Sequence, residues 1–95
     1  MDRKSYLLIC LAEECSEITQ RVSKALRFGL TEVQPGWNAD NITRLCSEVN
    51  DLLGVVEMCK KDVPGFNLNP EQIELKKEKV ERYFAYSKKM GIVKE

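Results

Sequence analysis

Two pairs of acidic residues are spaced so that their carboxylates can act together. Glu14 with Glu17, and Glu48 with Asp51, each lie three residues apart in segments that otherwise have the apolar pattern of buried helices. On a helix this spacing places both side chains on one side, about 4.5 Å apart along the axis. Two like charges about 4 Å apart repel by about 4 kcal/mol at an effective dielectric of 20. We therefore expect a cation between the two pairs.

The available ligands are all oxygen atoms. The chain has no histidine, and its four cysteines form no C-x-x-C pair. The absence of histidine excludes Ser-His and Cys-His nucleophile pairs and most transition-metal sites, and the cysteine spacing suggests neither a zinc cluster nor a redox motif. Carboxylates alone suit Mg²⁺ or Mn²⁺, and Mg²⁺ usually shares its coordination with substrate phosphates. The spacing leaves one alternative open, in which all four acids are solvated residues of a helix surface.

Basic residues follow the first acidic pair by one heptad. Arg21 and Lys24 come seven residues after Glu14 and Glu17, on the same face and about 10 Å further along the helix. That separation is comparable to a triphosphate, and Arg27 extends the basic end. For Arg21 alone we prefer a simpler interpretation, an ion pair with Glu17 at i,i+4.

Three helical segments must position these residues. Apolar residues recur at three- and four-residue steps over residues 4–27, and Gly29 is suited to close this helix. Asp40 or Asn41 can cap a second helix over residues 41–61. A third helix begins with Asn69 and Pro70, a cap followed by proline at the first helical position, and ends near residue 91.

The second helix is apolar on nearly every face in its second half, which must therefore be covered on all sides. The residues concerned are Leu52, Leu53, Val55, Val56, Met58 and Cys59. Two other helices of one short chain cannot enclose it, and the third has only a narrow apolar stripe that places it on the outside. We expect an all-α fold, a single domain over residues 1–95, and a four-helix bundle completed by dimerisation, with higher assembly also open.

Composition argues against several partners. Fifteen basic residues balance fifteen acidic ones, so no overall field would hold nucleic acid or an anionic membrane. No apolar run approaches the roughly 18 residues that a membrane span requires. The segment from Met1 to Lys4 leads into an acidic helix, so we expect no signal sequence, and we interpret the cysteines as small, reduced core residues. These features favour a cytoplasmic protein.

The acidic segments resemble a known family. Glu13-Glu14-Cys15-Ser16-Glu17 and Glu48-Val49-Asn50-Asp51-Leu52-Leu53 are similar to the E-E-x-x-E and E-x-x-D signatures of the MazG-like all-alpha nucleoside triphosphate pyrophosphohydrolases. The resemblance extends over roughly residues 7–86. One departure is the thirty residues that separate Glu17 from Glu48, which is long for the family.

The resemblance implies Mg²⁺-dependent hydrolysis of a ribo- or deoxynucleoside triphosphate to the monophosphate and pyrophosphate, in a homodimer or homotetramer. It also implies that Glu14, Glu17, Glu48 and Asp51 hold the metal. Basic residues of the third helix would lie near the phosphates. The candidates are Lys76, Lys79 and Arg82, of which Lys79 and Arg82 are our choice.

Within this hypothesis Glu14 or Glu13 takes a proton from the attacking water, and Lys24 with Arg27 holds the anionic end of the substrate. Glu13 points about 100° away from Glu14 and can equally be a further ligand or a solvated acid. The main alternative is a helical interaction or regulatory module without turnover. A nucleic-acid binder using the basic residues of the third helix is disfavoured by the zero net charge.

Overall fold

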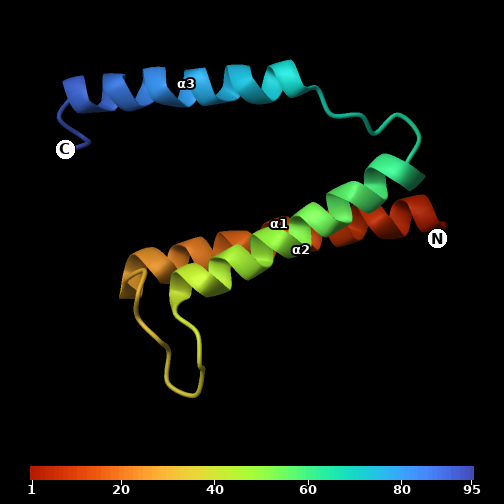
Figure 1. The fold of residues 1–95 in the computed structure, drawn as a ribbon, viewed down its shortest axis with the longest axis horizontal. Coiled ribbons are helices and arrows are strands. Elements are labelled where there is room, and N and C mark those ends of the chain that lie inside the picture. Colours follow the sequence, from red (N-terminus) through yellow and green to blue (C-terminus); the bar gives the residue numbers. More distant parts are fainter.

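The computed structural model describes all residues 1–95 and consists of three helices joined by two loops (Figure 1). These are α1 (Arg3–Phe28), α2 (Asn41–Asp62) and α3 (Pro70–Lys89). The predicted all-α class is confirmed, and the boundaries agree with the sequence pattern within one or two residues. None of the three helices has a stretch long and apolar enough to cross a membrane.

Side-chain caps explain where the helices begin. The carboxylate of Asp2 accepts a hydrogen bond from the backbone N–H of Ser5, and that of Asp40 accepts one from Thr43. The Asn69 side chain accepts from the first turn of α3, where Pro70 needs no partner. Of the two predicted caps for α2, Asp40 is therefore the correct one.

The end of α1 requires glycine. Gly29 has a φ of 102°, a left-handed conformation that residues with a Cβ rarely adopt, and its N–H donates to the carbonyl of Ala25. The chain then turns through a loop and returns as α2. This reversal makes α1 and α2 an antiparallel pair (Figure 1).

The small core lies where the start of α1 meets the end of α2. Leu7, Cys59 and Val63 are buried there, with Val55 and Phe66 packed against them. The Cys59 thiol lies 3.9 Å from the Leu7 carbonyl. All four cysteines are free thiols, but Cys15 and Cys46 are exposed and Cys10 is half-buried, so only Cys59 fits the prediction of a core cysteine.

α3 stands apart from the antiparallel pair, with no packing contact to α1 or α2 (Figure 1). The radius of gyration is 16.9 Å, whereas a compact chain of this length would have about 12 Å. The accessible surface is 7602 Å², against about 5,600 Å² for a compact monomer of this mass. A single chain thus contains only two packed helices and leaves about 2,000 Å² more surface in water than a compact fold would.

Candidate metal and phosphate site

Three of the four predicted metal ligands come together between α1 and α2. One carboxylate oxygen from each of Glu14, Glu17 and Glu48 can be chosen so that all three lie within 4.8 Å of one another. The antiparallel register explains this meeting. Starting from the buried Leu7–Cys59 contact, ten residues forward on α1 reach Glu17 and eleven residues back on α2 reach Glu48, so the two acids lie at nearly the same level.

Two carboxylate oxygens of this cluster are shut away from water and lack a hydrogen-bond donor. They are Oε2 of Glu14 and Oε2 of Glu48, and both residues are half-buried. Glu17 is exposed. A buried carboxylate oxygen without a donor is costly, so a cation among these oxygens would be favourable. The four acids are therefore not all solvated residues of a helix surface.

The electrostatics of the cluster raise two pKa values. Burial raises the pKa of Glu14 above its ordinary value, and the negative charges of Glu17, Asp51 and Glu13 raise it further. The pKa of Glu48 is raised chiefly because its protonated form can donate a hydrogen bond to Glu17, and then by burial and by the neighbouring charges. Burial and neighbouring negative charge thus contribute to both raised pKa values, although neither shift is due chiefly to charge.

Asp51 and Glu13 lie at the margin of the cluster. Both are exposed, and neither belongs to the group of converging oxygens. Their charges nevertheless contribute to the raised pKa of Glu14, and that of Asp51 also to the raised pKa of Glu48. The structure thus brings together Glu14, Glu17 and Glu48 and places Asp51 and Glu13 nearby.

The expected ion pair between Glu17 and Arg21 is wrong, because the structure has no salt bridge between them. Arg21 is half-buried instead, and its Nη1 atom is shut away from water with no hydrogen-bond acceptor. Arg21 therefore has one guanidinium nitrogen available to an acceptor, about one helical turn beyond Glu17. Sequence reasoning set Arg21 aside, although its heptad spacing from Glu14 was the signal that could have identified it.

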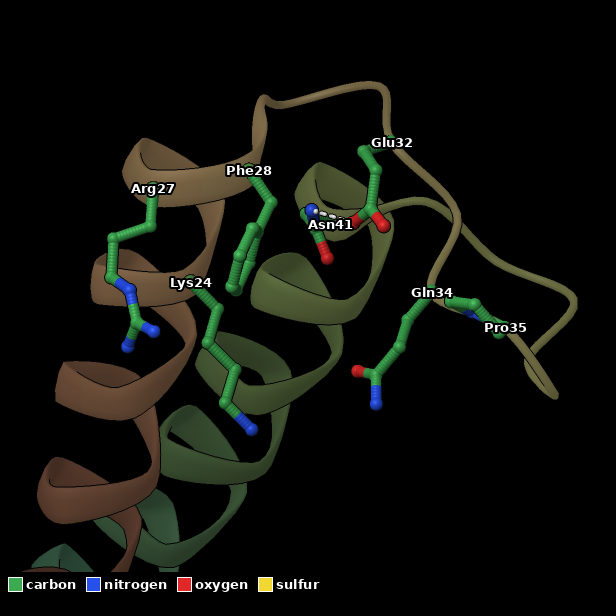
Figure 2. A pocket seen from close by; sticks show the side chains of 7 residues that line it. All are labelled: Lys24, Arg27, Phe28, Glu32, Gln34, Pro35 and Asn41. Atoms are coloured by element: carbon green, nitrogen blue, oxygen red, sulfur yellow. Dashed lines mark hydrogen bonds between the residues drawn. The ribbon is translucent and has the colours of Figure 1, made fainter.

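Lys24 and Arg27 line a pocket of about 370 Å³ where α1 ends and α2 begins (Figure 2). The other lining residues are Phe28, Glu32, Gln34, Pro35 and Asn41. The Arg27 guanidinium lies over the ring of Phe28, 4.9 Å from its centroid. Lys24 and Arg27 lie about one and two turns beyond Arg21, at the C-terminal end of α1.

Lys79 and Arg82 are not brought to the acids within one chain. They line a separate surface pocket on α3 together with Gln72, Leu75 and Lys76. Since α3 does not contact α1 or α2, these residues could meet the acidic cluster only if α3 moved or came from another copy.

Comparison with known proteins finds no matching family model, no similar curated protein and no similar solved structure.

The raised pKa values predict how stability depends on pH. Between the unfolded value of about 4.5 and the raised folded values, Glu14 and Glu48 hold more protons when folded than when unfolded. Stability therefore falls as the pH rises through this window and levels off above it. The helix caps Asp2 and Asp40 have lowered pKa values, so their contribution to the free energy of unfolding is lost only when the pH falls below about 3.8. Thermal unfolding in EDTA between pH 4.5 and 7.5 should show the melting temperature falling, and a rising one would contradict this electrostatic account.

Proposed function

We propose that the chain is a Mg²⁺-dependent hydrolase that cleaves nucleoside triphosphates to the monophosphate and pyrophosphate. The observation that carries the proposal is the group formed by Glu14, Glu17 and Glu48, with its buried oxygens that lack donors. It agrees with the family signatures that the same residues resemble. The free thiols suit a cytoplasmic setting.

The donor set fits a hard divalent cation. Three carboxylates converge without any nitrogen or sulfur ligand, and Asp51 lies outside this group at the margin of the cluster. The resemblance would make Asp51 a fourth ligand, which requires its side chain to turn toward the other three. Mg²⁺ commonly takes a few carboxylates and completes its coordination with water and phosphate oxygens, and Mn²⁺ accepts the same ligands. When bound, the metal would neutralise phosphate charge and assist the attacking water.

The remaining chemistry falls to the residues around the cluster. Glu14 is the preferred proton acceptor, because its carboxylate belongs to the group that would hold the metal and so would lie close to a metal-bound water. Glu13 is the alternative base on the exposed side. Arg21 has an unpartnered buried nitrogen one turn from Glu17, and Lys24 follows within the next turn. Both can donate to phosphate oxygens, with Arg27 beyond them.

Assembly into a homodimer or homotetramer would complete the fold. Two antiparallel pairs of α1 and α2 would make a four-helix core, and the roughly 2,000 Å² of excess surface matches what one chain contributes to a large obligate interface. In such an assembly α3 of one chain could approach the acids of another and bring Lys79 and Arg82 to the phosphates.

A second candidate is an interaction module without turnover. It is favoured by the isolation of α3, whose large apolar residues are exposed in a single chain. Those residues are Ile73, Leu75, Val80, Tyr83, Phe84 and Tyr86. A module of this kind has no use for the converging acids, which is why we rank it second.

The test is pyrophosphate release, measured by coupling to inorganic pyrophosphatase, across the eight common ribo- and deoxynucleoside triphosphates. Turnover should require Mg²⁺ or Mn²⁺ and disappear in EDTA. Absence of turnover with all eight substrates and both metals would reject the enzyme and leave the interaction module.

Lys24→Met should separate substrate binding from metal binding. Removing one charge-assisted hydrogen bond should lower kcat/KM by about tenfold or more. Mg²⁺ affinity without nucleotide should change little, because Lys24 lies about 10 Å from Glu17 along α1, which is about one Debye length at 0.1 M salt. Isothermal titration with Mg²⁺ and steady-state kinetics measure the two effects.

Arg21→Met is the companion variant. If Lys24→Met behaves as wild type while Arg21→Met loses activity, the phosphates lie nearer the acids than the heptad spacing implies. If neither variant loses activity, α1 does not supply the phosphate contacts.

A further inference from the structure

The pocket at the junction of α1 and α2 contains a buried amide whose orientation is fixed. Asn41 is 3% exposed, and its Nδ2 atom donates to the Gly29 carbonyl at 2.8 Å and to Oε1 of Glu32 at 2.9 Å. Both partners are acceptors, so the nitrogen must be the atom between them. Its two hydrogens are then used, and its oxygen remains as a free acceptor. Figure 2 shows this oxygen turned away from Glu32.

Two loop residues give the pocket further polar groups. Glu32 is half-buried, and its second carboxylate oxygen is free to accept. Oε1 of Gln34 accepts from Nη1 of Arg44 at 3.0 Å, which leaves the Gln34 amide nitrogen to donate. Arg44 is itself held over the ring of Trp37, 3.9 Å from its centroid. On the side of the loop and α2 the pocket therefore offers two acceptors, from Asn41 and Glu32, and the donor of Gln34, while Lys24 and Arg27 add cationic donors from α1.

We propose that this pocket binds the base of the nucleotide and selects guanine. The edge of guanine presents two adjacent donors, N1–H and the N2 amino group, beside the acceptor O6. Adenine presents one amino group beside one acceptor, cytosine presents one amino group beside two acceptors, and uracil and thymine present one N–H between two acceptors. Guanine is the base that sets two donor atoms side by side next to an acceptor, which is the pattern that two acceptors and a neighbouring donor complement. The ring of Phe28, which also lines the pocket, offers an aromatic face for stacking.

The position of the pocket suits a nucleotide whose phosphates reach the acids. Asn41 precedes Glu48 by one heptad on α2, and Lys24 follows Glu17 by one heptad on α1, each about 10 Å along its helix. The pocket volume of about 370 Å³ is within the range of small-molecule sites. This inference rests on the proposed function, and it places Lys24 at the nucleoside end of the phosphate chain rather than at its anionic end.

The first measurement needs neither metal nor turnover. Isothermal titration in EDTA with GMP, AMP, CMP and UMP should show GMP binding about tenfold or more tightly than the others. In a second measurement, kcat/KM with Mg²⁺ should be highest for GTP and dGTP.

Glu32→Gln is the decisive variant because it keeps the shape of the side chain. Its amide oxygen can still accept from Asn41, while its amide nitrogen replaces the free acceptor by a donor. The pocket would then match the N1 acceptor and N6 amino group of adenine. The ratio of GMP to AMP affinity should fall by about tenfold or more, and the preference should move toward adenine. Glu78→Gln on α3 makes the same chemical change outside the pocket and should retain the wild-type ratio.

The possible results distinguish the two proposals. Selective GMP binding that Glu32→Gln reverses, without triphosphate turnover, would support the base pocket and reject the hydrolase. Triphosphate turnover with equal use of all bases, or with a preference that Glu32→Gln leaves unchanged, would overturn the guanine pocket and retain the hydrolase. Neither binding nor turnover would reject both. Circular dichroism of each variant verifies that its helices are intact.

Discussion

Glu48→Gln should abolish Mg²⁺-dependent hydrolysis, lowering kcat/KM by more than about 100-fold. Glu48 is the only member of the converging group that comes from α2, so its loss would leave the metal held from one helix. Even residues that merely orient metal ligands cost about 10-fold to 100-fold when changed. The expected loss is therefore larger than the effect of any single basic residue near the phosphates.

The same substitution should stabilise the metal-free protein. At neutral pH the Glu48 carboxylate has a buried oxygen without a donor and lies beside Glu17 and Glu14. A glutamine removes one negative charge and can donate a hydrogen bond to Glu17, which is the interaction that raises the pKa of Glu48. The melting temperature in EDTA should rise at pH 7.5, and its dependence on pH above about 4.5 should weaken. Added Mg²⁺ should stabilise the wild type and have little effect on the variant.

Glu57→Gln provides the matched control, since Glu57 is an exposed acid on the same helix outside the cluster. It should retain wild-type turnover and the wild-type response to Mg²⁺. Full activity in Glu48→Gln would remove Glu48 from the site. A lowered melting temperature without metal would mean that its carboxylate stabilises the fold through a contact other than those described.

The helices were predictable because their signals are local. Asp40, Asn69 and Pro70 act at helix starts through backbone hydrogen bonds to their nearest neighbours. Gly29 ends α1 because its own φ is positive. The period of the apolar residues predicts the helical segments between these starts and ends. Neither the caps nor the period depends on how distant parts of the chain pack.

The acidic cluster could be predicted because two periodic helices joined antiparallel leave few possible registers. The helical period alone places Asp51 toward the edge of the apolar arc of its helix, which agrees with its exposure. The sequence did not show that Glu17, which is also exposed, joins the converging group while Asp51 does not. The Arg21 prediction was wrong for a related reason, since an i,i+4 spacing makes an ion pair available but does not decide where a partly buried guanidinium points.

The base pocket could not have been predicted because it depends on contacts between distant residues. Sequence reasoning saw Asn41 only as a possible helix cap. In the structure its backbone N–H donates to the Glu32 carbonyl, and its side chain ties both Gly29 and Glu32 to the start of α2. The Asn41 side chain is buried because it donates hydrogen bonds to the loop, and these bonds depend on the path that the loop takes. The periodic pattern of apolar residues carries no information on that path.

Leu53→Asp should prevent assembly while leaving the single chain folded. Leu53 is 53% exposed on α2, so a charge there remains in water if the protein is a monomer. If a second copy covers this face, the same charge would be buried without a partner and would cost several kcal/mol at each copy of the interface. Sedimentation at micromolar concentration should show the wild type as a dimer or tetramer and the variant as a monomer.

Ser47→Asp is the control for charge alone, because Ser47 is an exposed polar residue of the same helix. It should leave the oligomeric state unchanged. A wild type that sediments as a stable monomer would contradict the assembly directly. That outcome would also leave α3 without a partner and the excess surface without a cover, so the isolated third helix would then need a different protein to bind.

If Leu53→Asp is monomeric and also inactive, while Ser47→Asp keeps both properties, the active site depends on a second copy. The basic residues of α3 would then be the first candidates for what that copy supplies.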